Sequence, residues 1–213
     1  MRDHSQRCPL CGAAAQYYGD YHKRRFFECA ECYLISSDRT RLLNPLEERD
    51  RYLLHQYDET NQGYLEYLDA VIKPARQFIS RSGPCLDYGS GPACILAKVL
   101  ADKGYQCESF DPFFIKTNLK PPYDTIFSTE VFEHFNAVSS EIAKLLLLLS
   151  KGGILAVMTQ FNTAGNIFGD WHYIRDKTHL SFYSIETLHW IKNKFDLEIL
   201  FCDNKRVVIY RKN

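Results

Sequence analysis

Apolar and polar positions alternate with two different periods along most of this chain. The apolar run at residues 85–88 ends at two glycines, and the apolar residues that follow recur at helical spacing, which predicts a strand, a tight turn and a helix. Further apolar runs at 105–111, 124–129 and 154–159 predict strands, and a leucine-rich segment that ends at Ser150 predicts a helix. Strands that alternate with helices in this way predict a parallel sheet with helices on both faces.

Two features distinguish this sheet from a regular doubly wound one. The apolar segments 196–202 and 206–210 are separated only by a short turn, so these two strands must run antiparallel. Only twelve residues lie between Asp111 and Asp124, too few for a full helix and strand with their loops. We therefore predict a Rossmann-like, doubly wound α/β fold with a mostly parallel sheet, an abbreviated third-strand region and a reversed strand in a C-terminal hairpin.

Four of the eight cysteines form two Cys-x-x-Cys pairs near the start of the chain, Cys8 with Cys11 and Cys29 with Cys32. Thiolates at this spacing point at one ion, and two such pairs complete a four-sulfur shell that leaves no open position for chemistry. We predict a structural zinc in a small N-terminal zinc ribbon over residues 1–36, with an iron site of the rubredoxin type as the alternative.

The predicted ribbon has two interpretations. The segment between its cysteine pairs predicts a β-hairpin that turns near Gly19-Asp20. In the first, the module is only an appendage that its ion holds together. In the second, it contacts substrate or RNA through Lys23, Arg24 and Arg25. Residues 1–32 carry five basic and four acidic side chains, and this balance of +1 (five minus four) favours the appendage.

Charge and hydropathy exclude some classes of function. Lys+Arg and Asp+Glu both number 26, whereas a protein that depends on non-specific nucleic-acid binding shows a basic excess. The leucine run Leu145–Leu149 is far shorter than the roughly 20 residues that span a bilayer. Met1–Gln6 is polar and lacks the apolar region of a secretory signal. We therefore expect a cytoplasmic protein that acts on a small molecule rather than on nucleic acid or a membrane.

The turn Gly89-Ser-Gly91 is typical of a site for a nucleotide-type ligand. Glycines let the backbone approach a ligand, and the N-terminus of the following helix offers free N–H groups. Asp111 ends the next predicted strand, twenty residues beyond Gly91, where a carboxylate accepts the ribose hydroxyls of nucleosides. Phe113 follows and is placed to cover an adenine. Alternatively, Asp111 is a turn residue, since Asp-Pro starts many turns.

Together these motifs resemble those of the class I S-adenosylmethionine-dependent methyltransferases. The resemblance covers residues 84–212 and is carried by Leu86–Gly91, Asp111, Tyr123–His134, Lys151–Leu155 and the closing hairpin. The Glu130-Val-Phe-Glu-His134 block is similar to that of small-molecule methyltransferases, including quinone O-methyltransferases. With its cysteine pairs and residues 171–179, the whole chain resembles a bacterial group of that superfamily with an N-terminal zinc ribbon.

The resemblance implies a domain order and a cofactor site. Residues 37–80 would form a helical connector that covers the cofactor, and residues 81–213 the methyltransferase domain. Within that domain, the glycine turn would hold the amino-acid end of S-adenosylmethionine, the acid after the second strand its ribose, and the end of the next strand would border the sulfonium. The residues expected to contact the cofactor are Asp87, Gly89, Ser90, Gly91, Asp111, Pro112, Phe113, Thr129 and Glu130.

Methyl transfer to a hydroxyl or an acidic carbon is helped by a base. The candidates for this base are His134, His172 and His179. A helix that began at Glu130 would place His134 on the same face, with Glu133 adjacent in sequence. The cluster is then a catalytic base, a carboxylate–histidine site for a divalent cation, or only the acidic start of a helix.

Residues 171–179 mix aromatic, basic and acidic side chains, a composition suited to holding a polar substrate and closing over it. We predict that Trp171 and Arg175 bind the acceptor, together with Tyr64 of the connector. The alternative is an ordinary connection with its own hydrogen bonds, in which Asp176 pairs with Arg175 or His179.

The predicted function is methyl transfer from S-adenosylmethionine to a small-molecule acceptor, at a hydroxyl or carbon rather than an amine. Two alternatives remain open. One is an RNA methyltransferase that uses the ribbon to hold its substrate, and the other is a non-catalytic zinc-bearing protein that binds the cofactor. A nicotinamide-dependent dehydrogenase fits less well because of the closing reversed hairpin.

Overall fold

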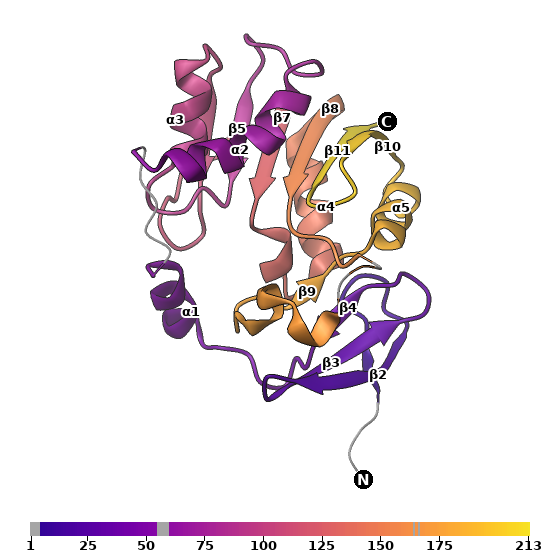
Figure 1. Cartoon of the computed structure of the whole chain (residues 1–213). Coiled ribbons are helices and arrows are strands. Elements are labelled where there is room, and N and C mark those ends of the chain that lie inside the picture. Colours follow the sequence, from indigo (N-terminus) through magenta and orange to yellow (C-terminus); the bar gives the residue numbers. More distant parts are fainter. Residues whose placement is uncertain (1–4, 55–59, 164, 166) are drawn as a thin grey trace.

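The computed structural model describes residues 5–54, 60–163, 165 and 167–213. Its centre is a six-stranded sheet in the order β10-β11-β8-β7-β5-β6 (Figure 1). The strands are β5 Cys85–Tyr88, β6 Cys107–Phe110, β7 Tyr123–Thr129, β8 Leu149–Met158, β10 Leu197–Cys202 and β11 Val207–Lys212. Strands β5 to β8 are parallel, and β11 runs antiparallel to both β8 and β10. The predicted doubly wound fold with one reversed strand is confirmed.

The stretch between β6 and β7 contains no third strand. Residues 111–122 form turns and irregular backbone, apart from an isolated bridge between Asp111 and Ile115. Strand β6 is therefore the edge of the large sheet, and the prediction of an abbreviated third-strand region is confirmed.

Strand β8 shows how the two faces of the sheet are filled, because successive side chains of a strand point to opposite faces. Ile154, Ala156 and Met158 pack with two helices on one face, while Leu155 and Val157 pack with two helices on the other. The helices are α2 Gln62–Ala75 and α3 Ile95–Asp102 on the first face, and α4 Val138–Leu148 and α5 Ile185–Lys194 on the second.

The N-terminal module forms a second sheet that the sequence did not predict in full. Its order is β1-β2-β3-β4-β9, with β1 Ser5–Arg7, β2 Ala14–Tyr21, β3 Arg24–Cys29, β4 Ile35–Ser37 and β9 Ser181–Phe182. Strand β9 comes from the C-terminal half of the chain and pairs with β4, Ile35 opposite Phe182. Figure 1 shows this sheet below the lower ends of β7 and β8. The ribbon is thus continuous with the rest of the molecule through a shared sheet.

The hairpin inside the ribbon turns three residues later than predicted. β2 and β3 are joined at His22 and Lys23, which both adopt a positive φ of 50° and 63°. Gly19 instead lies where the register of the two strands shifts, opposite Phe26. Glycine here forms a bulge, while the two turn residues adopt the left-handed backbone that such hairpins require.

In its described residues, 37–54 and 60–80, the predicted helical connector contains two helices. Helix α1, Pro45–Tyr52, begins with a capping box between Asn44 and Glu47, and α2 begins at the capping residue Asn61. The domain boundaries at residues 36 and 80 stay predictions. Within the described ranges, no helix is long and apolar enough to cross a membrane.

Candidate active site

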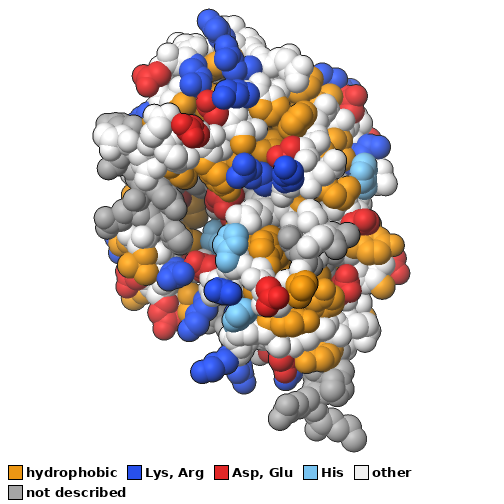
Figure 2. All heavy atoms as spheres, viewed as in Figure 1, with side chains coloured by type: hydrophobic (Ala, Val, Ile, Leu, Met, Phe, Trp, Pro, Cys, Tyr) orange, Lys and Arg blue, Asp and Glu red, His pale blue; other side chains and the backbone are white. Residues whose placement is uncertain are grey.

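The carboxyl ends of the parallel strands open into a cavity of about 1990 Å³. Its walls come from the turns after β5, β6 and β7, from α1 and the start of α2, and from residues 172–179. In Figure 2 histidine side chains lie beside a hollow on the face shown. This edge of an open α/β sheet is where ligands generally bind.

The glycine turn after β5 leaves room for a ligand. Gly89 has a φ of 81°, and a side chain there would come within 2.4 Å of Val131, so only glycine fits. Gly91 has a φ of 62°, yet no atom lies within 4 Å of the place where its Cβ would be. The chain therefore approaches a space at Gly91 without filling it, as a cofactor cradle requires.

Asp87 is a buried carboxylate near the end of β5. Its side chain is 1% exposed, and neither oxygen makes a hydrogen bond of ordinary geometry within the described chain. Burial raises the pKa of Asp87 to about 7, against a smaller opposing effect of the Ala97 backbone N–H. Such a group fits a ligand that brings a positive charge, and the ammonium group of S-adenosylmethionine has that charge.

Asp111 is fully engaged by the backbone around it. Its carboxylate accepts hydrogen bonds from the N–H groups of Gly91 at 3.0 Å, Phe113 at 2.8 Å and Phe114 at 3.1 Å. The turn role given as the alternative is therefore present, and it also ties the glycine turn to the end of β6. Asp111 lines the cavity as well, with Pro112 and Phe113. Its contact with a ribose stays a prediction.

The end of β7 departs from the predicted helix. Glu130 has a φ of 54° and its N–H donates to the carbonyl of Met158 at 2.7 Å, so it belongs to a turn. A short 3-10 helix, η1, covers Phe132–His134, and α4 begins only at Val138. The prediction that Glu130 and His134 share a helix face is wrong, because the positive φ at Glu130 breaks the helical backbone.

Glu130 instead binds two tyrosines that sequence reasoning missed. It accepts a hydrogen bond from Tyr67 on α2 at 2.7 Å and a longer one from Tyr173 at 3.4 Å. Burial and the neighbouring Glu133 raise the pKa of Glu130 well above its ordinary value. Tyr67 had a weak signal in the sequence, a hydroxyl inside an apolar helical stripe, while Tyr173 directly follows His172, a predicted site residue.

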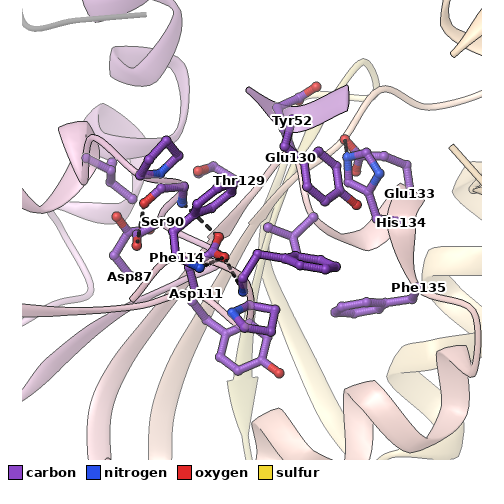
Figure 3. Close-up of a pocket in the computed structure, with 18 of the residues that line it drawn as sticks. Tyr52, Asp87, Ser90, Asp111, Phe114, Thr129, Glu130, Glu133, His134 and Phe135 are labelled. Carbon is purple, nitrogen blue, oxygen red and sulfur yellow. Dashed lines mark hydrogen bonds and ion pairs between the residues drawn. The ribbon is translucent and has the colours of Figure 1, made fainter. Parts of the chain in front are cut away.

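Glu133, His134 and His179 converge at the opposite end of the cavity from Asp87. Figure 3 shows Asp87 and Asp111 at one end and Glu133 with His134 at the other. The Nε2 atom of His134 lies 3.8 Å from Oε1 of Glu133, and the rings of His134 and His179 are 4.9 Å apart. The structure thus brings together two of the three predicted catalytic histidines.

Burial sets the protonation of this cluster. Glu133 is 0% exposed, and its Oε2 accepts a hydrogen bond from the hydroxyl of Thr159 at 2.7 Å. Burial raises the pKa of Glu133 to about 7. For His179, burial and the nearby His134 lower the pKa to about 3, so its imidazole is neutral at physiological pH.

The segment 171–179 divides into a buried part and a part that faces the cavity. His172 and Arg175 are exposed and line the cavity, as does Tyr64 from α2. Trp171 does not line the cavity. It is 9% exposed, donates to Gln160 at 3.2 Å and packs among aromatic side chains against the ribbon, so its predicted contact with the acceptor is not supported.

Asp176 pairs with a residue that sequence reasoning did not consider. Its carboxylate accepts hydrogen bonds from Arg51 on α1 at 2.9 Å and from the hydroxyl of Thr178 at 2.7 Å. Burial opposes ionisation, but the hydrogen bond from the Thr178 backbone N–H at 2.9 Å and these two bonds together lower the pKa of Asp176. No local pattern distinguishes Arg51 from other charged residues of α1, because its partner lies 125 residues away.

The four ribbon cysteines form a compact group. The Sγ atoms of Cys8 and Cys32 are 3.4 Å apart, those of Cys11 and Cys29 are 3.3 Å apart, and all four lie within 4.8 Å of one another. Four thiolates so placed suit a tetrahedral ion and leave no position for a substrate.

The fold was compared with solved structures. Over 92% of this chain it matches 99% of the Burkholderia thailandensis 1,6-didemethyltoxoflavin-N1-methyltransferase, solved with S-adenosylhomocysteine, at 13% identity and a TM-score of 0.55. It also matches the magnesium protoporphyrin IX methyltransferase of Synechocystis PCC 6803, covering 79% of this chain and 94% of that one at 17% identity and a TM-score of 0.53. An O-methyltransferase family 2 protein of Planctomyces limnophilus, in complex with apigenin, gives 14% identity over 80% of this chain and 63% of that one, with a TM-score of 0.51. These likenesses concern the fold.

The fold and the cavity at its strand ends define a class I methyltransferase. A sequence model described as a methyltransferase domain matches residues 57–200, more than half of the chain. The chain belongs to this methyltransferase domain family, and the prediction that it is an S-adenosylmethionine-dependent methyltransferase is confirmed. Among curated proteins, no sequence matches it.

Proposed function

We propose that the protein transfers the methyl group of S-adenosylmethionine to a hydroxyl or an acidic carbon of a small molecule. The observation that carries this proposal is the arrangement of one cavity with two chemically different ends. Asp87 and Gly91 offer a negative charge and open space at one end, and a glutamate with two histidines lies at the other. A methyl donor and an acceptor held at these ends would meet between them, beside Thr129 and Glu130.

The residues present fit the cofactor. The carboxylate of Asp87 would hold its ammonium group, the backbone at Gly91 would border its amino-acid end, and Asp111 with Phe113 would lie along its nucleoside. Bound S-adenosylmethionine supplies an electrophilic methyl group, and its sulfur keeps the electron pair of the broken bond. The protein mainly has to align the acceptor in a closed cavity, because the donor is already reactive.

The histidines supply the base that an oxygen or carbon acceptor needs. Nδ1 of His134 lies 3.0 Å from the carbonyl oxygen of Thr178, and Nδ1 of His179 lies 2.8 Å from that of Tyr173. A carbonyl oxygen only accepts, so both rings are protonated on Nδ1 and, when neutral, present an unprotonated Nε2. In this proposal Nε2 of His134 or His179 takes the proton of the acceptor. His172 is exposed and stays a weaker candidate.

The ribbon supports a small-molecule acceptor better than RNA. Arg24, one of the basic residues nominated for RNA, donates hydrogen bonds to the carbonyl oxygens of Ile174 and Asp176 and is therefore directed inward. With 26 basic and 26 acidic side chains, the chain also lacks the excess of positive charge that RNA favours. We infer that the four cysteines hold a structural zinc, in agreement with the resemblance to a zinc-ribbon group of the superfamily. The cytoplasmic location stays a prediction.

Two measurements test the function. Calorimetric titration with S-adenosylhomocysteine should show one site per chain, and a panel of phenols, enols and hydroxy acids should reveal an acceptor through product formation.

Replacing His134 by Ala should lower kcat about 100-fold or more, the scale of a lost general base, and leave cofactor affinity unchanged. His189, exposed on α5, gives a matched control in His189→Ala. A folded protein that binds no cofactor would refute the proposal, and one that binds it tightly without any turnover would favour the non-catalytic alternative.

A further inference from the structure

One carboxylate and two imidazoles meet at the acceptor end of the cavity. Glu133 and His134 come from η1, and His179 comes from the segment before β9, 45 positions later in the chain (179 minus 134). One oxygen of Glu133 and one ring nitrogen of each histidine lie within 4.8 Å of one another. The three groups thus come from two separate segments and lie close together.

Hydrogen bonds prepare both histidines as ligands. Because each Nδ1–H donates to a backbone carbonyl, each neutral ring directs an unprotonated Nε2 away from that carbonyl. Metal-binding histidines commonly use their second ring nitrogen in this way, since the bond fixes the tautomer and the ring orientation. The carbonyls come from Thr178 and Tyr173, so the substrate segment itself orients the two rings.

Glu133 gives an independent sign that something is bound here. Its side chain is 0% exposed, and its Oε1 makes no hydrogen bond of ordinary geometry within the described chain, while Oε2 accepts one from the hydroxyl of Thr159. A buried carboxylate oxygen without a partner is costly unless a cation or a donor satisfies it. The oxygen that lacks a partner is the one that lies 3.8 Å from Nε2 of His134.

We propose that Glu133, His134 and His179 bind a divalent first-row transition-metal ion on one face. Two imidazoles and one carboxylate suit zinc, iron(II), manganese or cobalt and leave the opposite positions open. Metal–ligand bonds of about 2.1 Å keep neighbouring ligand atoms about 3 Å apart, so the three side chains must close in by rotation when an ion enters. The predicted carboxylate–histidine site is thereby assigned to Glu133 with both histidines, and Glu130 is excluded because two tyrosines bind it.

This assignment rests on the methyl transfer of the proposed function and narrows its acceptor. It replaces the role of a base that was given there to Nε2 of His134 or His179. The ion would hold an acceptor oxygen and acidify it, and the proton would leave to solvent, because both Nε2 atoms are then ligands. The favoured acceptors are therefore compounds with an acidic hydroxyl group, such as enols, phenols and hydroxy carbonyl compounds. An amine, which the metal would engage through the lone pair needed for attack, is disfavoured.

Manganese(II) alone is a suitable probe, because it prefers oxygen and nitrogen ligands and competes poorly for the four thiolates of the ribbon. Titration of the zinc-loaded protein, followed by electron paramagnetic resonance, should show one manganese site per chain. Glu133→Gln and His179→Ala should each weaken that site about tenfold or more. His189→Ala, which alters an exposed histidine of α5, should leave it unchanged, and elemental analysis should find the ribbon zinc intact in all three variants.

The outcomes separate this inference from the proposed function. Absence of a saturable manganese site, or equal affinity in wild type and both cluster variants, would overturn the metal site. If the buried Glu133→Gln variant fails to fold, His179→Ala carries the test. Calorimetry with S-adenosylhomocysteine in the presence of a chelator examines the cofactor end alone, so retained cofactor binding without manganese binding overturns only the metal site. Manganese binding without cofactor binding overturns only the methyltransferase proposal.

Discussion

The guanidinium of Arg24 donates a hydrogen bond to the backbone carbonyl oxygen of Asp176, 2.6 Å away. Arg24 begins strand β3 of the ribbon, and Asp176 lies in the segment that walls the acceptor end of the cavity. The same side chain donates to Ile174 at 2.7 Å and also to His179. The ribbon therefore holds the segment that carries a candidate catalytic histidine.

We predict that Arg24→Gln lowers kcat/KM for the acceptor about tenfold or more, because hydrogen bonds from a charged donor contribute about 1.5–3 kcal/mol each and three are lost. Affinity for S-adenosylhomocysteine should change little, since Arg24 is remote from the cofactor end. Arg25→Gln is the matched control, because the side chain of Arg25 stays within the ribbon, where it forms a partly exposed ion pair with Asp20 at 3.4 Å and lies over the ring of Tyr17. Equal kinetics of the two variants would contradict the role given to Arg24.

Loss of one ribbon cysteine should disturb two distant segments. Cys29→Ser should abolish zinc binding and loosen residues 1–36, as metal-dependent modules require. Because β4 pairs with β9, the structure adds faster hydrogen exchange around Ser181 to that expectation. Elemental analysis measures the metal and exchange mass spectrometry the loosening, with Cys202→Ser as the control. Full zinc content in Cys29→Ser would refute the ligand assignment.

Asp111 has two roles that a pair of variants can separate. Asp111→Ala should weaken S-adenosylmethionine binding by about 1–3 kcal/mol and also lower the melting temperature, because three backbone N–H groups lose their acceptor. Asp111→Asn keeps an oxygen for the turn, so it should melt closer to wild type yet still bind the cofactor more weakly. Unchanged affinity in both variants, measured by calorimetry, would exclude contact with the ribose.

Asp87 should make stability depend on pH. In the unfolded chain its carboxyl titrates near 3.8, whereas burial raises the pKa to about 7 in the folded protein. Between these values the folded protein binds a proton that the unfolded chain has released, so this group lowers stability as the pH rises from about 4 to 7. We predict that Asp87→Asn melts above wild type at pH 8 and that the difference shrinks toward pH 5.

The same substitution should weaken cofactor binding about tenfold, the scale of one lost charged hydrogen bond. In wild type, affinity for S-adenosylmethionine should fall as the pH drops below 7, because Asp87 takes up a proton. Thermal scans and calorimetry at several pH values measure both effects. A difference in melting temperature between the two proteins that stays constant from pH 5 to pH 8 would show that Asp87 is not the titrating group.

The parts of the fold with a local signature could be predicted from the sequence. The strand at Cys85, the glycine turn and the following helix appear in the alternation of apolar and polar residues. The missing third strand followed from chain length alone, because twelve residues cannot form the elements required. The spacing of the four cysteines in two Cys-x-x-Cys pairs likewise predicted their cluster.

What could not be predicted depends on contacts between distant residues. Strand β9 has two residues, too few to show a period, and is a strand only because β4 lies beside it. A helix was expected from Glu130 onward because its residues favour one, yet the bond from Glu130 N–H to Met158 fixes a turn. The partnership of Arg51 with Asp176 had no local sign for the same reason.

Because β4 pairs with β9, the two ends of the cavity are supported by different sheets. The proposed cofactor end is built on turns of the large sheet, whereas the proposed acceptor end includes residues 172–179, which are hydrogen-bonded to Arg24 of the ribbon. Changes in the ribbon can therefore reshape the acceptor wall while the turn at Gly89 and Gly91 stays as it is. In a methyltransferase built this way, the specificity for the acceptor can change while the binding site for the methyl donor stays the same.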